Sequence, residues 1–415
     1  MSVTEVESRG RTFCRGCNSK NLFSGLDLGE LPIANELWSS ASTSVEIFPL
    51  HLRICAECGL GQVEDVVTPS RLFKDYRYLS STSSSFLEHA KKFSSEVGKK
   101  LKLTNQDWVL EIASNDGYLL RNFVELGIPV LGIEPAENVA EIATALGVPS
   151  ISEFFGSELA KKLVKERGHP RLIIANNVMA HVPNLRDFIL GLKILAGSNT
   201  VISIENPSLI NLLEQNQFDT IYHEHFSYLT VYSVRKIASN LGLELFDVDQ
   251  IEVHGGSNRY WLQLASRNTS NQMKLDKLAQ DELESGLLDY SAWISFANRI
   301  NTLISNLHRW LESAHLEGRR IYGYGAAAKA STLLNAALIQ LNWLPLIADE
   351  SSEKQGRFMP TTGIPIVSPQ EMFAQRPTDV IVFPWNISKE IAEKIRESDN
   401  RIRIWRAVPR MEEVD

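Results

Sequence analysis

The stretch DWVLEIASNDGYLL, residues 107–120, decides the fold class of this chain. Its apolar run Trp108 to Ile112 has the character of a buried strand, which is followed by a turn ending at Gly117 and by a helix expected over 118–126. Further strands are expected at 129–133 and 171–175, with a helix over 136–146 between them. Strands that alternate with helices are typical of a parallel α/β sheet. The sequence therefore predicts an α/β protein whose central domain is Rossmann-like.

Polar residues at the expected strand ends predict a cofactor site. Ligands of parallel sheets bind at the carboxyl ends of the strands, where an acid such as Glu134 can accept both hydroxyls of a ribose. The first turn carries one glycine instead of G-x-G-x-x-G, and its Asn115-Asp116 pair adds negative character. It would repel a diphosphate but not the sulfonium and amine of S-adenosylmethionine; a purely structural turn is the alternative. The expected cofactor-binding residues are Glu111, Ser114, Asn115, Asp116, Gly117, Glu134, Pro135, Asn176 and Asn177.

Composition and charge limit the possible classes of function. The 415 residues, 44% hydrophobic and 22% charged, are ordinary for a globular protein and suffice for about three domains of roughly 150 residues each. The 50 acidic and 42 basic residues give a net charge of −8, which makes a poor surface for nucleic acid. The sequence contains neither a membrane-spanning apolar run nor the apolar stretch of a signal peptide. We therefore expect a cytoplasmic protein with no nucleic-acid or membrane partner.

The four cysteines form two C-x-x-C pairs, Cys14 with Cys17 and Cys55 with Cys58. In a reducing compartment such a set favours a metal site over two disulfides. Four thiolates match tetrahedral Zn²⁺ with no open position, so we expect a structural role for the metal. Redox-active dithiols or thiols without a metal are the alternative.

A second strand–turn–helix unit begins with RRIYGYGAAAKASTLLN, residues 319–335. Its turn reads G-x-G-x-x-A, and Lys329 lies on the first turn of the expected helix, where a cation could meet a phosphate. Strands are expected at 343–348, which leads into Asp349-Glu350, and at 379–383. NAD, a nucleotide-sugar diphosphate or a purely structural role all remain open for this unit. Residues 275–317 are expected to be a helical connection.

Two of the nine histidines fall in Tyr222-His223-Glu224-His225, after an expected strand at 201–204 that ends in Glu205-Asn206-Pro207. Histidine titrates near neutrality, and a neighbouring carboxylate can orient it and raise its basicity, so we favour a general base here. A second metal site and a surface histidine pair are the alternatives. His181, in another loop at a strand end, is a secondary candidate.

At the level of motifs, the chain resembles the three-domain, S-adenosylmethionine-dependent C-methyltransferases of nucleotide-linked deoxysugars. The resemblance covers nearly the whole chain and rests on the order of its motifs: C-x-x-C with LGELPIANEL, C-x-x-C, DYRYLSSTSSSF, VLEIASNDGYLL, GIEPAENVA, ANNVMAHVPN, DTIYHEHFSYLT, HGGS and GYGAAAKA. It implies a zinc-binding module at 1–75, a methyltransferase domain at 76–270, a helical connection at 271–318 and a C-terminal Rossmann-like domain at 319–415.

The resemblance also implies the reaction, which is methylation at C3 of a 4-keto sugar bound as a nucleoside diphosphate. It implies that His225 is the base and that Tyr222, Glu224, His181 and Tyr76 line the reaction centre. The C-terminal fold would help to hold the nucleotide sugar. The expected substrate-binding residues are Tyr78, Ser80, Asn206, Gly323, Gly325, Ala326, Lys329 and Glu350.

The expected mechanism passes through an enolate. His225 would remove the C3 proton, and Tyr222 or a nearby donor would stabilise the oxyanion that develops on the ketone. Two other functions stay open from the residues alone. One is an NAD-dependent nucleotide-sugar oxidoreductase that uses the C-terminal G-x-G-x-x-A turn, and the other is a non-catalytic, zinc-anchored binding module.

Overall fold

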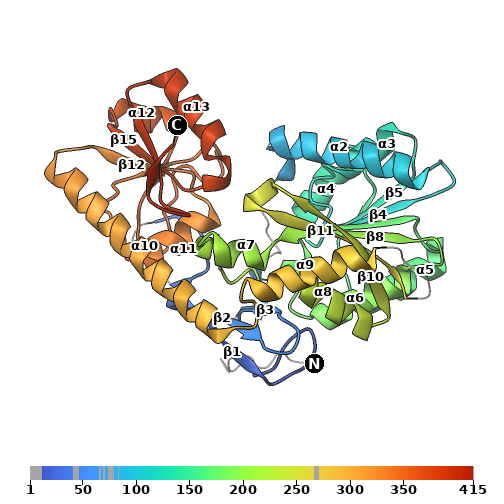
Figure 1. Cartoon of the computed structure of the whole chain (residues 1–415). Coiled ribbons are helices and arrows are strands. Elements are labelled where there is room, and N and C mark those ends of the chain that lie inside the picture. The colour runs from blue at the N-terminus through green and yellow to red at the C-terminus, as the bar shows by residue number, and fades with distance from the viewer. Residues whose placement is uncertain are drawn as a thin grey trace.

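The computed structural model consists of three sheets and the helices that cover them (Figure 1). The α/β prediction is confirmed, because the two larger sheets are mostly parallel and are flanked by helices. The structure describes residues 12–40, 46–64, 67–68, 71–72, 79–82, 84–265 and 271–414, and only the backbone of residues 84, 85 and 254.

The central sheet has seven strands in the order β10-β11-β8-β7-β4-β5-β6. All neighbours are parallel except β11, which runs antiparallel to both β8 and β10. The chain order reverses between β4 and β7, so the crevice at their carboxyl ends is the expected place for a ligand. The strands are β4 Val109–Ile112, β5 Val130–Ile133, β6 Ser150–Ile151, β7 Leu172–Asn176, β8 Val201–Pro207, β10 Leu243–Ile251 and β11 Ser257–Leu264.

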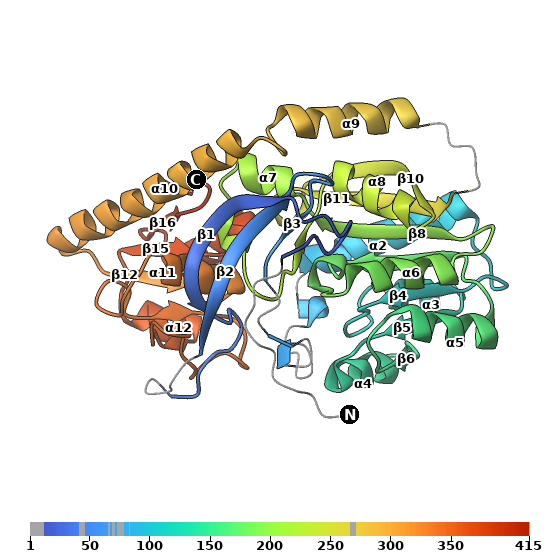
Figure 2. The same cartoon turned by 90° about the horizontal axis from the view of Figure 1, so that it is seen from below.

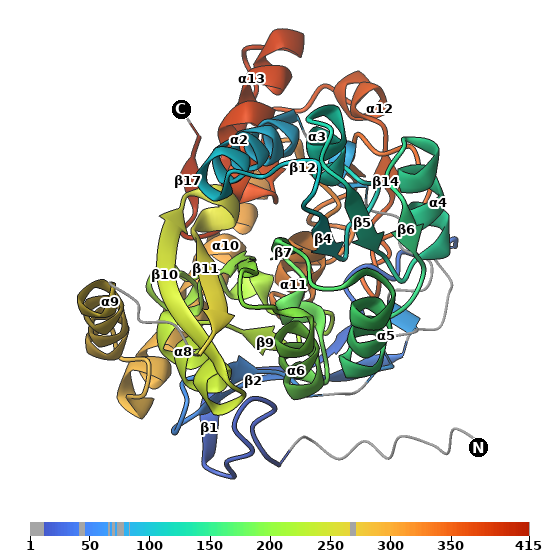
Figure 3. The ribbon, with the colours of Figure 1, turned by 90° about the vertical axis from the view of Figure 1, so that its right-hand side faces the viewer.

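Helices cover both faces of this sheet, with α2 and α3 on one side of it and α6 and α8 on the other (Figure 3). One face packs against α2, α3 and α4, and the other packs against α5, α6 and α8. Burial on both faces explains why β4 has apolar residues on both of its faces, with Glu111 as its one polar residue. The helices are α2 Ser84–Leu101, α3 Leu120–Glu125, α4 Glu137–Ala145, α5 Ser157–Arg167, α6 Leu185–Leu195, α7 Leu209–Glu214 and α8 Val231–Asn240.

The N-terminal sheet is antiparallel and has the order β1-β2-β3-β9. Its last strand comes from far along the chain, because Gly61 pairs with Tyr228 and Gln62 pairs with Ser227. The cysteine-bearing segment is therefore joined by hydrogen bonds to the residues that follow the histidine motif. The strands are β1 Leu22–Pro32, β2 Ile47–Cys55, β3 Gly61–Gln62 and β9 Ser227–Tyr228.

The C-terminal sheet has the order β14-β13-β12-β15-β16-β17 and is parallel except for β17. The strand expected at 343–348 is much shorter, since only Ile347 and Ala348 pair with β12. Pro345 lies within that run, and a proline cannot donate to a sheet. The elements are β12 Ile321–Tyr324, α11 Ala328–Ala336, β13 Ile347–Ala348, β14 Ile366–Val367, α12 Pro369–Ala374, β15 Asp379–Val382, α13 Ser388–Ser398, β16 Arg403–Arg406 and β17 Glu412–Glu413.

The stretch expected to be a helical connection consists of two helices, α9 Gln272–Glu284 and α10 Tyr290–Leu316. Gly286, at φ +93°, turns the chain between them, and the Asp289 carboxylate caps α10 by accepting from the Ser291 N–H at 2.9 Å. The apolar face of α10 packs in one core with the N-terminal and C-terminal sheets. Figure 2 shows β1 and β2 between the C-terminal unit and the central sheet, with α10 beside them.

Five single turns of 3₁₀ helix complete the described part of the fold: η1 Ser80–Thr82, η2 Met179–His181, η3 Phe218–Thr220, η4 Val253–Gly255 and η5 Trp385–Ile387. Within the described ranges, no helix combines the length and the apolar character that crossing a bilayer requires.

Candidate functional site

The turn after β4 is held against the turn after β5 by Glu134. One oxygen of its carboxylate accepts from the Asn115 N–H at 3.0 Å, and the other accepts from the Ala136 N–H at 2.9 Å. Gly117 takes φ +77°, a conformation that favours glycine, and the turn follows directly from the strand. The helix expected from residue 118 begins at Leu120 because this turn extends that far. Each Glu134 oxygen has a second lone pair, so the carboxylate can still accept from a ligand.

The carboxyl groups of Glu111, Asp116 and Glu134 gather at these turns. Burial, together with the charges of Glu134 and Asp116, raises the pKa of Glu111 well above its ordinary value. Burial also raises the pKa of Glu134, against the hydrogen bonds from Ala136 and Asn115. A cluster of carboxyl groups with little solvent favours a cationic ligand over an anionic one.

Several buried polar atoms at the carboxyl ends of the central strands have no hydrogen-bond partner in the described part of the chain. Buried polar groups are normally satisfied, so such a cluster indicates a place where a ligand supplies the missing partners. The atoms belong to Glu111, Ser114, Asp116, Asn176, Asn177 and Asn206.

The segment around η1 closes over the first turn. The Ser80 N–H donates to Oδ1 of Asn115 at 2.8 Å, and the Ser81 N–H donates to Oδ2 of Asp116 at 3.2 Å. Ser80 is therefore placed against the expected cofactor turn. Tyr76 and Tyr78 lie outside the described residues.

The histidine motif lies in a loop between η3 and β9. Nδ1 of His225 is 3.0 Å from the Thr220 carbonyl oxygen, and Nε2 is 2.8 Å from the Tyr222 hydroxyl. A carbonyl oxygen can only accept, so Nδ1 donates to it, and whenever the ring is neutral Nε2 carries the lone pair. This is the tautomer that a base needs at Nε2.

His181 lies against the same ring, with 4.7 Å between the two imidazole centroids. Its Nδ1 donates to the Glu224 carbonyl oxygen at 2.8 Å. Burial lowers the pKa of His181 to about 4, so the ring is neutral at neutral pH. A neutral neighbour does not oppose protonation of His225.

The Glu224 side chain is hydrogen-bonded to the N-terminal segment. Its Oε1 accepts from the Asn35 backbone N–H at 3.3 Å and from the Asn35 side-chain amide at 3.0 Å. Burial raises the pKa of Glu224 to about 7. In this arrangement, the side chain of Glu224 joins two parts of the chain, and its backbone orients His181.

The sequence did not single out a cluster of three side chains at the end of β8, in which the buried pair Glu205 and Arg259 meets the half-buried His89. Glu205 accepts from Arg259 at 2.7 Å and lies 3.0 Å from Nε2 of His89. Burial alone would raise the pKa of Glu205, but His89 and Arg259 outweigh it and hold the pKa below its ordinary value. Arg259 lies directly opposite Glu205 on β11, a register that only the folded hairpin reveals. Asn206, the next residue, belongs to the unsatisfied cluster described above.

The C-terminal glycine turn is filled by protein atoms. A Cβ on Gly323 would lie 2.7 Å from the Phe383 ring, and one on Gly325, at φ +88°, would lie 2.4 Å from Pro384. The Ala326 N–H donates to the Asp349 carboxylate at 2.8 Å, where an anion would otherwise bind. Close packing against Phe383 and Pro384 explains the two glycines, and the Asp349 carboxylate occupies the position at which an anion would bind. Glu350, beyond the next strand, accepts from the Tyr324 hydroxyl at 2.6 Å.

Lys329 lies where the C-terminal unit meets the histidine loop. Its ammonium donates to Oδ1 of Asn386 at 2.6 Å and lies 4.2 Å from the Trp385 ring centroid. Burial lowers the pKa of Lys329 to about 8, against the charge of Asp219. Asp219 in turn accepts from the Trp385 indole N–H at 2.8 Å.

Helix α11, which begins next to Lys329, also contacts the histidine loop directly. The Thr332 hydroxyl donates to the Ile221 carbonyl oxygen at 3.0 Å. The C-terminal unit is therefore in contact with the loop that carries Tyr222 and His225.

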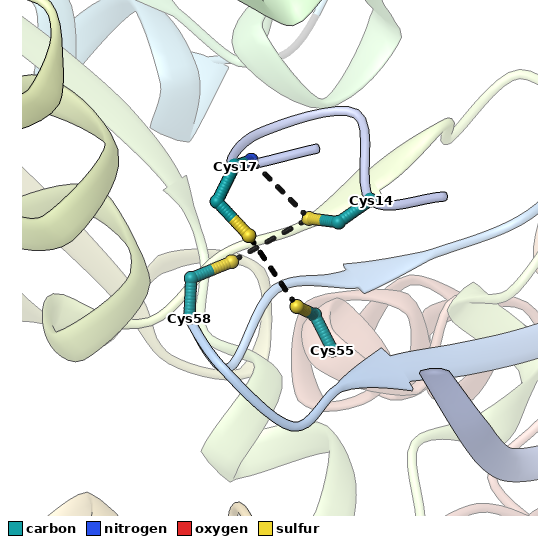
Figure 4. Close-up of side chains that lie close together, drawn as sticks. All are labelled: Cys14, Cys17, Cys55 and Cys58. Carbon is teal, nitrogen blue, oxygen red and sulfur yellow. Dashed lines mark hydrogen bonds between the residues drawn. The ribbon is translucent and has the colours of Figure 1, made fainter. Parts of the chain in front are cut away.

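The four cysteines converge at the end of the N-terminal sheet (Figure 4). Sγ atoms are 3.5 Å apart for Cys14 and Cys58 and 3.6 Å apart for Cys17 and Cys55, and all four sulfur atoms lie within 4.8 Å of one another. Zinc–sulfur bonds of about 2.3 Å in a tetrahedron separate the sulfur atoms by about 3.8 Å, so the cluster fits one Zn²⁺. The separations are far beyond a disulfide bond, and all four cysteines are free thiols.

Comparisons with known proteins agree with this geometry. Residues 14–73 match a family model described as "Putative zinc binding domain", residues 86–248 match "Methyltransferase domain", and residues 252–409 match "C-methyltransferase C-terminal domain". C-methyltransferase NovU from Streptomyces niveus is 30% identical over 386 residues, which are 92% of this chain and 92% of that protein. The chain belongs to the C-methyltransferase family.

Two solved structures each align with slightly less than half of this C-methyltransferase. The PH0226 protein of Pyrococcus horikoshii OT3 aligns with a TM-score of 0.36 and 15% identity, covering 48% of this chain and 96% of that one. An S-adenosylmethionine-dependent methyltransferase from Clostridium acetobutylicum ATCC 824 aligns with a TM-score of 0.35 and 12% identity, covering 43% of this chain and 92% of that one.

Membership of the family confirms the prediction that the chain is a methyltransferase that uses S-adenosylmethionine. The match of residues 14–73 confirms the predicted zinc-binding region. The residues present fit both groups. Acidic and unsatisfied polar atoms at the β4 and β5 turns suit a cationic cofactor with donor groups, and four converging thiols suit Zn²⁺. The NAD-dependent oxidoreductase and the non-catalytic binding module are not supported by these matches.

Proposed function

We propose that this C-methyltransferase methylates C3 of a nucleoside-diphosphate 4-keto-deoxysugar through an enolate, with His225 as the general base. The observation that carries the proposal is the orientation of His225. Its Nδ1–H is fixed by the Thr220 carbonyl, which leaves the lone pair on Nε2 beside the Tyr222 hydroxyl.

The chemistry requires a base and a donor in contact. A carbon beside a ketone is acidic because its carbanion spreads onto oxygen as an enolate. Nε2 of His225 would take the C3 proton, and Tyr222 would turn its O–H from Nε2 to the developing oxyanion. The neighbouring ring of His181 is neutral at neutral pH, so it does not destabilise the imidazolium that His225 becomes.

The cofactor would be held at the turns after β4 and β5. Glu134 would accept from the ribose hydroxyls, and the carboxyl groups of Glu111 and Asp116 would face the cationic methionine end. When bound, S-adenosylmethionine supplies an electrophilic methyl group for the nucleophilic carbon. Asn115 and Asp116 keep the first turn covered through their contacts with residues 80–81.

The sugar nucleotide would lie between the edge of the central sheet and the C-terminal unit. Asn206 offers an amide whose donor and acceptor atoms are both unsatisfied in the described chain, which suits a sugar hydroxyl or carbonyl. Lys329 offers a cation beside the histidine loop, which suits a phosphate.

The decisive experiment is a substrate panel. The protein should be incubated with S-adenosylmethionine and dTDP-, GDP- and CDP-linked 4-keto-deoxysugars, and mass spectrometry should detect the gain of one methyl group for one hydrogen. NMR of the product would locate the new methyl group. A methyl group on oxygen, or on a carbon other than C3, would contradict the proposal.

A second experiment isolates the base from the methyl donor. In D₂O without S-adenosylmethionine, the protein should exchange the C3 hydrogen of the true substrate for deuterium, because exchange needs only proton removal. His225→Ala should abolish this exchange while leaving cofactor binding intact. Exchange at the wild-type rate in His225→Ala would place the base elsewhere, and His181 would then be tested first.

A further inference from the structure

The segment from Cys14 to Cys17, here called the metal knuckle, carries a buried arginine. This arginine is hydrogen-bonded to segments that lie next to His181 and His225. Arg15 stands between the two thiols of Cys14-Arg15-Gly16-Cys17, and only 2% of its surface is exposed. Its guanidinium donates through Nη1 to the Pro183 carbonyl at 2.9 Å and through Nη2 to the Val63 carbonyl at 2.7 Å. A buried cation held in this way fixes the distance between the two carbonyl-bearing segments.

These two segments lie next to His181 and His225. Pro183 follows His181 by two residues, at the end of the turn η2. Val63 donates its N–H to the Phe226 carbonyl at 3.2 Å, and Phe226 is the residue after His225. The Phe226 ring also lies under the guanidinium, 5.3 Å from it. The Arg15 side chain therefore connects the segment that follows His181 with Val63, which is hydrogen-bonded to the residue after His225.

The knuckle itself has little freedom to move. The Arg15 backbone N–H donates to Oε1 of Gln62 at 2.9 Å, and Arg186 donates to the Gly16 carbonyl at 3.0 Å. A Cβ on Gly16 would lie 2.4 Å from the Ile237 side chain on α8. The thiol cluster, Arg15 and the histidine segments thus form one continuous set of contacts.

We propose that Arg15 is a positioning residue of the methyltransferase site, which transmits the geometry of the metal knuckle to His181 and His225. The roles of these two histidines rest on the proposed function. Arg15 acts on them through the carbonyls of Pro183 and Val63, which its two guanidinium nitrogens hold. The zinc-binding segment would then set the alignment of the base as well as stabilise the fold.

The test compares two identical substitutions. Arg15→Lys keeps the charge but cannot span both carbonyls with one planar fork. Arg299→Lys is the control for the same chemical change at an exposed position. Arg299 also donates to a backbone carbonyl, that of Leu213 at 2.6 Å, and lies 5.7 Å from the Phe296 ring. Both proteins should retain zinc by elemental analysis, and both should bind S-adenosylmethionine with wild-type affinity by calorimetry.

The first readout is the ¹⁵N–¹H spectrum of the histidine side chains, which needs no substrate. Arg15→Lys should shift the ring signals of His181 and His225, whereas Arg299→Lys should leave them in place. The second readout is deuterium exchange at the substrate carbon, which should fall by about 10- to 100-fold in Arg15→Lys because small misplacements of reacting groups are costly. A methylation assay that finds no sugar substrate would contradict the proposed function, but the histidine spectra would still test the positioning role.

Two results would overturn the inference. One is unchanged histidine signals in Arg15→Lys with zinc retained. The other is loss of zinc or of the fold in that variant, which would mean that Arg15 serves the metal site alone. Arg186→Met provides a milder perturbation of the same knuckle through Gly16, and its histidine signals should move in the same direction by a smaller amount.

Discussion

The pKa of Glu224 gives a sharp prediction for the pH dependence of stability. The carboxyl group is 3% exposed and accepts two hydrogen bonds from Asn35, while its other oxygen has no partner among the described residues. Glu224→Gln keeps an acceptor toward Asn35 and cannot ionise. We expect this variant to be more stable than the wild type at alkaline pH but not at acid pH.

The sign follows from the two protonation states. Burial raises the pKa of Glu224 from 4.5 to about 7 in the folded chain, so folding favours the neutral acid. The stability that this preference provides is fully present below about pH 4.5 and is lost as the pH rises through about 7. A difference of one unit between the pKa values of the folded and the unfolded chain corresponds to about 1.4 kcal/mol. The rise from 4.5 to about 7 therefore amounts to about 3 kcal/mol in the free energy of unfolding.

The measurement is urea unfolding followed by tryptophan fluorescence, at about pH 5 and about pH 8. The free energy of unfolding of Glu224→Gln, relative to that of the wild type, should increase by up to about 3 kcal/mol between these two pH values. Glu125→Gln, at an exposed side chain of α3, controls for the loss of one negative charge. If the two variants show the same difference from the wild type at both pH values, burial does not govern the ionisation of Glu224.

Three further changes test the metal, the cofactor and the base. Cys55→Ser should lose the bound zinc and destabilise the N-terminal sheet, because structural zinc binding is coupled to folding; stoichiometric zinc in the purified variant would contradict this. Glu134→Ala should weaken binding of S-adenosylmethionine by about 1.5–3 kcal/mol for each charge-assisted hydrogen bond lost, and an unchanged affinity by calorimetry would remove Glu134 from the site. His225→Ala should lower turnover by about 10²–10⁴ with cofactor affinity unchanged, and Tyr222→Phe should lose less; wild-type turnover in His225→Ala would reject the assigned base.

Much of the central fold could be predicted because its signals are local. The apolar run before Glu111 is buried on both faces of the sheet, and the glycine turn that follows is visible in a few residues of sequence. The same holds for the cysteines, whose C-x-x-C spacing predicts converging thiols. Where local patterns failed, the cause was also local, as with Pro345, which shortens the strand expected at 343–348.

The partners of the site residues could not be predicted, because they are set by long-range contacts. Nothing in the sequence near Glu224 indicates Asn35, and nothing near Glu205 indicates that Arg259 will face it from β11. The same is true of Arg15, which sequence alone marks only as a residue between two cysteines. Register and packing between distant segments decide these contacts, and hydrophobic periodicity carries no information about either.

The pairing of β3 with β9 has a consequence for the order in which the chain assembles. During synthesis, β1, β2 and β3 emerge long before residues 227–228, so the edge of β3 stays open until most of the central domain has been made. An open edge of this kind offers unpaired backbone groups to other nascent chains. The same pairing makes residues 12–62 a poor candidate for autonomous expression, and removing them would uncover the edge of β9 instead. A shortened methyltransferase built from the central region alone should therefore aggregate, even though its seven-stranded sheet would be intact.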